Sequence, residues 1–225
     1  MSDASPLLVL SDVCLTLTGA AGPVDILRGI DLTVVAGEIV ALTGPSGSGK
    51  SSLLAVAAGL EQATSGSVRL LDQELVGRGE DSLAQLRRGV VGVVFQSFHL
   101  LPNMTAFENV ALAADLAGLS DAPGRARAAL ARVGIADRAA HYPGQMSGGE
   151  QQRTAVARAT VARPRIVFAD EPTGNLDSEA GKTVRDLLFG LAREDGASLV
   201  LVTHEPALAA ACDRIVRLAD GRVAA

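Results

Sequence analysis

The sequence predicts an α/β fold with a mostly parallel sheet, and three observations support this prediction. Runs of successive Val, Ile and Leu residues occur, which is typical of strands covered on both faces. Helical patterns separate the runs, as right-handed crossovers between parallel strands require. Polar residues follow each run, where ligands bind in open α/β sheets. The runs are EIVALTG (38–44), GVVGVVFQ (89–96), RIVFADE (165–171) and SLVLVTHE (198–205).

The helical patterns lie between these runs and in a long middle segment. A turn at Asp220-Gly221 predicts a closing hairpin with no further role. The expected helices cover residues 50–59, 105–117, 124–133, 150–162, 178–193 and 206–211.

The composition argues against a nucleic-acid-binding, membrane-spanning or secreted protein. With 225 residues, the chain can bury a sizeable core as a single folding unit. Its net charge of −5, without a basic run, argues against nucleic acid as the main partner. The longest uncharged run, 89–107, contains too many polar residues to favour a membrane span. The start MSDASPLLVL lacks a secretory pattern, and two distant cysteines suit a reducing cytosol.

The segment GPSGSGKS (44–51) stands between a predicted strand and a predicted helix. In this context its backbone N–H groups can surround a phosphate, Lys50 can reach β- and γ-phosphates, and Ser51 can bind Mg²⁺. The alternative is a Gly/Ser-rich linker that contains a lysine by chance, but a linker would not need the flanking strand and helix.

The other strand ends carry catalytic residue types. Asp170 suits Mg²⁺ binding through a water molecule, and Glu171 suits a general base for an attacking water. An ordinary acidic turn is the alternative. His204 would be taken as structural if it stood alone, but its place at the same edge favours a γ-phosphate contact. Gln96 ends the second run, and we expect all these side chains to meet in one crevice. We interpret His99 and His141 as structural or surface residues.

The segment HYPGQMSGGEQQR (141–153) opens a predicted helix with two glycines. Ser147 and Glu150 fit a capping box, which does not itself require glycine between them. Bare glycines at a helix N-terminus also suit a phosphate. From this segment alone the two interpretations are equally good.

Taken together, these motifs resemble the nucleotide-binding subunit of an ATP-binding-cassette (ABC) transporter over nearly the whole chain. The resemblance rests on GPSGSGKS, Gln96, MSGGEQQR (146–153), VFADEP (167–172), NLD (175–177) and His204, in the family's order. It implies a P-loop NTPase (RecA-like) core, an N-terminal antiparallel β lobe and an inserted helical lobe, all in one domain, 1–225. The expected ranges are 1–35 with 66–76 for the β lobe, 36–96 and 161–212 for the core, and 97–160 for the helical lobe.

The resemblance also implies roles for individual residues. Glu171, His204 and Gln96 would act in ATP hydrolysis, and Ser51, Gln96 and Asp170 would hold Mg²⁺. In a head-to-tail homodimer, Ser147, Gly148 and Gly149 would face the partner's ATP, and Asp177 would line the dimer seam. The phosphate loop would bind ATP through Gly44, Pro45, Ser46, Gly47, Ser48, Gly49, Lys50, Ser51 and Ser52.

Two departures from the family pattern stand out. Met146 and Glu150 replace the usual Leu and Gln, and Glu serves equally well in a capping box. The family usually stacks an N-terminal aromatic residue on adenine, near the position of Leu17, but no Phe, Tyr or Trp precedes Phe95 here. We therefore expect an aliphatic clamp that involves Leu17, with weaker selectivity for the base.

Within the family, the segments at 95–110, 170–179 and 211–222 resemble the lipoprotein-release and macrolide-efflux branch (LolD- and MacB-like), and most closely YbbA-type cassettes. This branch implies a membrane permease with a large extracytoplasmic domain as partner, and a peripheral, cytoplasmic location on the inner face of the cell membrane. A division-type regulatory cassette and a soluble ABC ATPase remain as alternatives. The apolar segment after Gln96 is either lobe core or a groove for a permease helix.

Overall fold

The computed structural model describes residues 6–19 and 22–224, so residues 1–5 and 20–21 of the predicted β lobe lie outside the described residues. The chain forms two compact units. Unit 1 comprises Met1–Arg87 and Ser198–Ala225, and unit 2 comprises Arg88–Ala197. Among the described residues, no helix combines the length and apolarity needed to cross a membrane.

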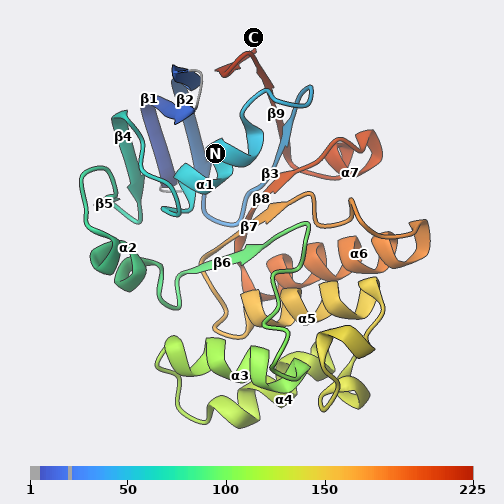
Figure 1. The fold of residues 1–225 in the computed structure, drawn as a ribbon. Coiled ribbons are helices and arrows are strands. Elements are labelled where there is room, and N and C mark those ends of the chain that lie inside the picture. The colour runs from blue at the N-terminus through green and yellow to red at the C-terminus, as the bar shows by residue number, and fades with distance from the viewer. Residues whose placement is uncertain (1–5, 20–21, 225) are drawn as a thin grey trace. The chain divides into compact units, whose positions relative to one another are not determined.

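Unit 1 contains an antiparallel sheet in the order β2-β1-β4-β5 (Figure 1). A long hairpin dominates it, because β1 (Pro6–Gly19) pairs with β2 (Gly22–Val35) along nearly its whole length. The short strands β4 (Ser65–Leu70) and β5 (Gln73–Glu74) complete the sheet. This is the antiparallel lobe that the sequence predicts.

The rest of unit 1 contains a group of mostly parallel strands and several helices. β3 (Ile39–Thr43) pairs in parallel with β8 (Ser198–Val202) and β9 (Arg214–Ala219), and β10 (Arg222–Val223) adds an antiparallel edge. Both β3 and β8 are apolar on successive residues and almost wholly buried, as expected for covered parallel strands. The helices are α1 (Lys50–Ala57), α2 (Glu80–Arg87) and α7 (Pro206–Ala210).

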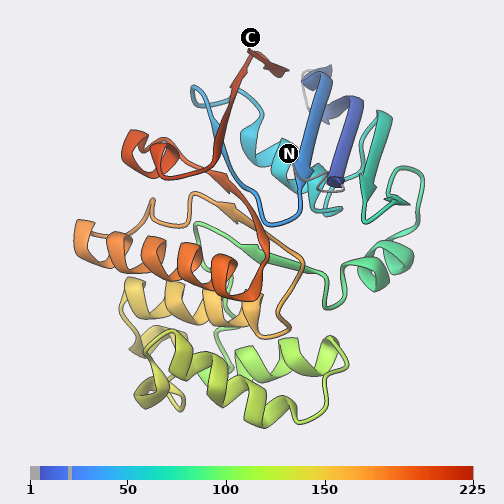
Figure 2. The same ribbon diagram turned by 180° about the vertical axis from the view of Figure 1, so that it is seen from behind.

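Unit 2 combines two parallel strands with a group of helices. β6 (Val91–Val94) pairs with β7 (Ile166–Asp170), so that Val94 lies opposite Ala169. The helices α3 (Ala106–Leu116), α4 (Ala122–Arg132) and α5 (Gly148–Thr160) pack on one another, and α6 (Ser178–Asp195) lies beside α5 (Figure 2). Two 3₁₀ turns, Ala136–Arg138 and Pro143–Gln145, precede α5.

Capping fixes where these helices begin. Thr105 and Ser147 each form a complete capping box, at α3 and α5, and Asp177 caps α6.

The sequence does not predict helix α2, because its eight residues contain few apolar positions and Leu83 is its buried residue. The fold class that the sequence predicts is confirmed.

Candidate functional site

The loop between β3 and α1 in unit 1 takes the form that a phosphate-binding loop needs. Gly44, Gly47 and Gly49 have φ angles of 145°, 77° and 98°, which side-chain-bearing residues rarely adopt. A Cβ on Gly44 would lie 2.1 Å from the carbonyl oxygen of Leu218, whereas a Cβ on Gly47 would meet none of the described residues within 4 Å. Gly44 therefore fits the loop against β9, and Gly47 leaves open space beside the backbone.

Two polar groups of the loop suit an anion. Lys50 is 8% exposed, and its Nζ donates to the carbonyl oxygens of Gly44 at 3.0 Å and Pro45 at 2.8 Å, so the ammonium group is held over the loop. The Ser48 Oγ is buried and has no hydrogen-bond partner among the described residues. Buried polar atoms are normally satisfied. A bound phosphate would give this hydroxyl an acceptor, so the loop fits such a ligand.

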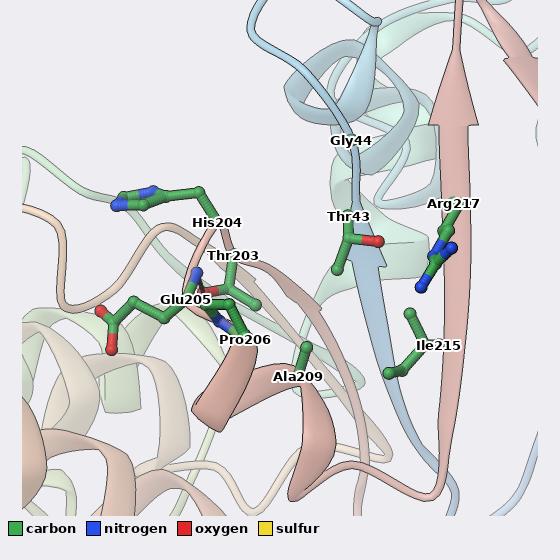
Figure 3. Close-up of a pocket in the computed structure, with 9 residues that line it drawn as sticks. All are labelled: Thr43, Gly44, Thr203, His204, Glu205, Pro206, Ala209, Ile215 and Arg217. Carbon is green, nitrogen blue, oxygen red and sulfur yellow. Dashed lines mark hydrogen bonds between the residues drawn. The ribbon is translucent and has the colours of Figure 1, made fainter.

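A cavity of about 280 Å³ connects this loop to His204 (Figure 3). His204 follows β8, and the parallel pairing of Leu42 with Val202 brings the ends of β3 and β8 to the same edge. The imidazole ring points away from Thr43 and Arg217 (Figure 3). The cavity is lined by Thr43, Gly44, Thr203, His204, Glu205, Pro206, Ala209, Ile215 and Arg217.

In unit 2, the residues after β6 and β7 form a second cluster. Gln96 and Asn175 exchange two hydrogen bonds: the Gln96 Nε2 donates to the Asn175 Oδ1 at 3.2 Å, and the Asn175 Nδ2 donates to the Gln96 carbonyl oxygen at 3.1 Å. A Cβ on Gly174 would lie 2.9 Å from the Gln96 Nε2 and 3.3 Å from the Glu171 Oε2. The predicted residues Gln96 and Glu171 thus both lie against Gly174.

Glu171 has an unusual backbone conformation. Its φ angle is 43°, in the left-handed region, although it has a long side chain and precedes a proline. Such conformations cost about 1–3 kcal/mol, and they persist only where the surrounding structure imposes them. The Gly174 N–H donates to the Glu171 carbonyl oxygen at 3.0 Å, which closes a tight turn. Asp170, the preceding residue, is the last of β7.

The start of α5 satisfies the capping interpretation in full. The Ser147 Oγ accepts from the Glu150 N–H at 3.3 Å, and the Glu150 Oε2 accepts from the Ser147 N–H at 2.8 Å. A Cβ on Gly149 would lie 3.1 Å from the Ala180 Cβ, so packing against α6 explains this glycine. A Cβ on Gly148 would make only ordinary contacts, the nearest at 3.5 Å. Packing therefore leaves Gly148 unexplained, and Gly148 is where a ligand would need bare backbone.

Two other predicted site residues have structural surroundings of their own. The Asp177 Oδ1 accepts from the N–H groups of Glu179 at 3.0 Å and Ala180 at 2.9 Å, so Asp177 caps α6 whatever else it does. Leu17 is 41% exposed and lies opposite Val24, which is 51% exposed, in the hairpin of β1 and β2. The two side chains form an exposed aliphatic pair.

The structure also identifies two residues to which the sequence analysis assigned no role. Asn175 appears in the NLD motif, but its pairing with Gln96 joins residues that are 79 positions apart. Gln152 lies within MSGGEQQR, and its side chain is fully buried. The sequence does not show that this amide is buried, so no local pattern indicated its internal contacts.

The chain matches the family model described as "ABC transporter" over residues 27–174. It is 52% identical over 200 residues to the uncharacterized ABC transporter ATP-binding protein YbbA of Escherichia coli K12, with 88% of each chain covered. It is 47% identical to the lipoprotein-releasing system ATP-binding protein LolD of Geobacter metallireducens, with 98% of this chain and 99% of the relative covered. It is 42% identical to the macrolide export ATP-binding/permease protein MacB of Shigella flexneri, covering 97% of this chain but 34% of that protein.

Solved structures agree with these matches. The chain superimposes with a TM-score of 0.90 on a dimeric, post-hydrolysis structure of the ATP-binding cassette MJ0796 bound to ADP and Pi, with 37% identity and 97% of each chain covered. The chain therefore belongs to the ABC transporter family. It is an ATP-binding cassette that is similar in type to the LolD, MacB and YbbA proteins.

Proposed function

We propose that this chain is the ATP-hydrolysing subunit of an ABC transporter complex and powers a membrane permease of the lipoprotein-release or macrolide-efflux type. The observation that carries the proposal is the phosphate loop, which combines left-handed glycines, the Lys50 ammonium group held on the loop carbonyls, and a buried Ser48 hydroxyl that has no partner among the described residues. The names of the LolD and MacB relatives supply the type of transporter.

In this proposal, hydrolysis uses the residues that the sequence motifs assign to it. The loop from Gly44 to Ser52 wraps the phosphates, and Lys50 exchanges its loop carbonyls for β- and γ-phosphate oxygens. Glu171 accepts a proton from a water that attacks the γ-phosphorus, the bond to the β–γ bridging oxygen breaks, and ADP leaves with that oxygen. His204 contacts the γ-phosphate. Ser51, Gln96 and Asp170 would hold Mg²⁺, which would shield the negative charge of the phosphates.

The donor set fits Mg²⁺. This ion is usually bound by one or two carboxylates together with several waters and substrate phosphates, rather than in an all-protein cage. Within the described part of the chain, no group of three or more His, Cys, Asp or Glu residues is arranged to hold a metal unaided. A hydroxyl, an amide oxygen and a carboxylate around a nucleotide would give the oxygen-rich set that Mg²⁺ prefers.

We further propose that two copies pair head to tail, so that Ser147, Gly148 and Gly149 of one copy face the ATP held by the other. Gly148 supports this, because no atom of the described part of the chain comes close enough to require a glycine at this position. The dimeric state of the MJ0796 structures agrees. Asp177 would then lie at the dimer seam while it caps α6. In this view residues 1–225 act as one catalytic domain with the lobe boundaries given above.

Mixing two inactive variants tests the head-to-tail arrangement. A Lys50→Ala copy and a Ser147→Arg copy each form homodimers in which both sites are damaged. A mixed dimer contains one doubly damaged site and one site with an intact phosphate loop and an intact α5 start. We expect ATPase activity to return on mixing and to be lost on extreme dilution. A mixture that never regains activity, from two variants that unfold at the wild-type temperature, would contradict the proposal.

The partner is tested by affinity purification from detergent-solubilised membranes. We expect a permease with several spans and a large extracytoplasmic domain, with the cassette bound peripherally on the inner face of the membrane. Recovery of a permease together with cell-wall hydrolases would instead support a division-type cassette. Recovery with ribosomes or DNA would support a soluble ABC ATPase.

A further inference from the structure

The side chain of Gln152 makes an unusual contact inside unit 2. It is 0% exposed, and its Nε2 donates to the carbonyl oxygen of Pro172 at 2.7 Å and to that of Phe95 at 3.3 Å. Pro172 directly follows Glu171, and Phe95 directly precedes Gln96. One amide group therefore holds the backbone next to two of the residues to which hydrolysis is assigned, Glu171 and Gln96.

The oxygen and the nitrogen of the Gln152 amide differ in their hydrogen bonding. The Gln152 Oε1 is buried and has no hydrogen-bond partner among the described residues. Leaving a buried acceptor unpaired is unfavourable. The contribution of this side chain to the structure thus comes from its N–H donors, which a methionine of similar length would lack.

The backbone that Gln152 holds is strained. Glu171 has a φ angle of 43°, and this conformation is unfavourable for a non-glycine residue that precedes proline. The bond from Gln152 fixes the next carbonyl group along the chain, at Pro172. Without it, the Glu171 backbone can relax, and its carboxylate moves with the backbone.

The same amide reaches the Gln96 side of the cluster. Its second acceptor, the Phe95 carbonyl, lies at the end of β6, and the next residue is paired with Asn175 through two hydrogen bonds. Gly174 lies against the side chains of both Gln96 and Glu171. A shift at either carbonyl is therefore passed to both side chains.

Gln152 belongs to α5, the helix that Ser147 and Gly148 begin. We propose that Gln152 is a positioning residue that couples the start of α5 to Glu171 and Gln96. A movement of α5, such as docking of a second copy against Gly148, would change the placement of the hydrolytic residues through one buried amide. This inference rests on the proposed function, because it acts on Glu171 as the general base.

Two substitutions at Gln152 separate hydrogen bonding from packing. Gln152→Met keeps the approximate shape and removes both donors. Gln152→Glu places a carboxyl group against two carbonyl oxygens, so burial and repulsion favour the protonated acid, which can still donate to one of them. The ATPase activity of Gln152→Glu should therefore recover as the pH falls. A role of Gln152 in packing alone does not predict this recovery.

Thr154→Val is the matched control. Thr154 is also fully buried on α5, but its Oγ1 donates to the Glu150 carbonyl oxygen at 2.9 Å, within the same helix. This variant loses a buried hydrogen bond of similar kind without losing a link to the loops.

ATPase kinetics, nucleotide binding and thermal unfolding are measured for the whole chain with Mg²⁺ and ATP. We expect kcat of Gln152→Met to fall by about 10- to 100-fold, the range for misplaced catalytic groups, while KM for ATP changes by less than about 2-fold. Thr154→Val should keep wild-type kcat. The kcat of Gln152→Glu, divided by that of the wild type at the same pH, should rise several-fold between about pH 8.5 and about pH 6.

The contrary results are equally definite. If Gln152→Met binds ATP and matches Thr154→Val in kcat, Gln152 does not position the site. If Gln152→Met fails to fold, a pH-independent ratio for Gln152→Glu contradicts the proposal by itself. Glu171→Gln distinguishes this failure from that of the proposed function. If Glu171→Gln hydrolyses ATP normally, the assignment of Glu171 is wrong; if it is inactive while Gln152→Met is normal, only the present inference is wrong.

Discussion

Arg138 donates from its Nε to the Oε1 of Glu150 at 2.7 Å, while the other oxygen of Glu150 completes the capping box with Ser147. One carboxylate therefore both begins α5 and ties it to the 3₁₀ turn that contains Arg138. The ion pair was not expected from the sequence, where Glu150 was assigned to the cap alone.

Glu150→Gln separates the two roles. A glutamine can still complete the capping box, but it cannot pair electrostatically with Arg138. Because the pair is partly exposed, we expect the free energy of unfolding to fall only slightly. ATPase activity should stay close to that of the wild type. Denaturant unfolding and steady-state turnover measure the two effects. A severe loss of turnover would show that the charge of Glu150 acts in the reaction.

The pH dependence of this contribution follows from the pKa of Glu150, which the hydrogen bond from Arg138, and next that from the Ser147 backbone, lower from 4.5 to about 2. As the pH falls below 4.5, the unfolded chain binds a proton at this residue while the folded chain does not. The stabilisation is thus complete above 4.5 and is lost as the pH falls toward 2. The difference in unfolding free energy between wild type and Glu150→Gln should shrink across this range. A constant difference down to the lower limit would contradict the assignment.

Local rules explain which parts of the candidate site the sequence indicates. The phosphate loop, the capping box at Ser147 and the strand ends at Gln96 and Glu171 each follow from a few adjacent residues. The contacts of Gln152 with Phe95 and of Gln96 with Asn175 could not be predicted, because they span 57 and 79 positions and depend on side-chain packing. The sequence also does not show why residue 149 is a glycine, because the cause is the close approach of Ala180, which belongs to another helix.

Gly44 and Gly47 share a left-handed backbone but differ in their surroundings, and alanine should distinguish them. Gly44→Ala would bring a Cβ to 2.1 Å from the Leu218 carbonyl oxygen, so the loop or β9 must shift and thermal stability should fall sharply. Gly47→Ala meets no neighbour and should cost only about 1–2 kcal/mol for its φ of 77°.

The rise in unfolding temperature on adding ATP is a second property that the glycine variants should affect differently. We expect Gly47→Ala to lose much of the ATP-dependent rise in unfolding temperature, because its side chain occupies the space beside the phosphate-binding backbone. Gly77→Ala, with a φ of 79° and open surroundings away from the loop, is the control and should keep that rise. If Gly44→Ala is as stable as Gly47→Ala, the contact with Leu218 does not constrain the loop.

Leu17 and Val24 lie opposite each other on the hairpin of unit 1, and Val24 belongs to β2, the strand that approaches the phosphate loop at Ile26. A Cβ on Gly49 would lie 3.0 Å from the carbonyl oxygen of Ile26, two residues beyond Val24. An exposed aliphatic pair so near the loop can cover the face of a purine but offers no hydrogen bonds that distinguish adenine from guanine. We therefore expect comparable turnover of ATP and GTP.

Leu17→Tyr tests this account of base binding. An aromatic ring at this position should strengthen nucleotide binding, because a base–aromatic stack is worth about 1–3 kcal/mol in nucleic-acid complexes. Leu116→Tyr, at an exposed position on α3, should leave affinity unchanged and serves as the control. Titration with ATP and GTP measures the effect. A strong preference for ATP that survives every substitution at Leu17 and Val24 would mean that other residues hold the base, since neither member of the pair would then influence the choice.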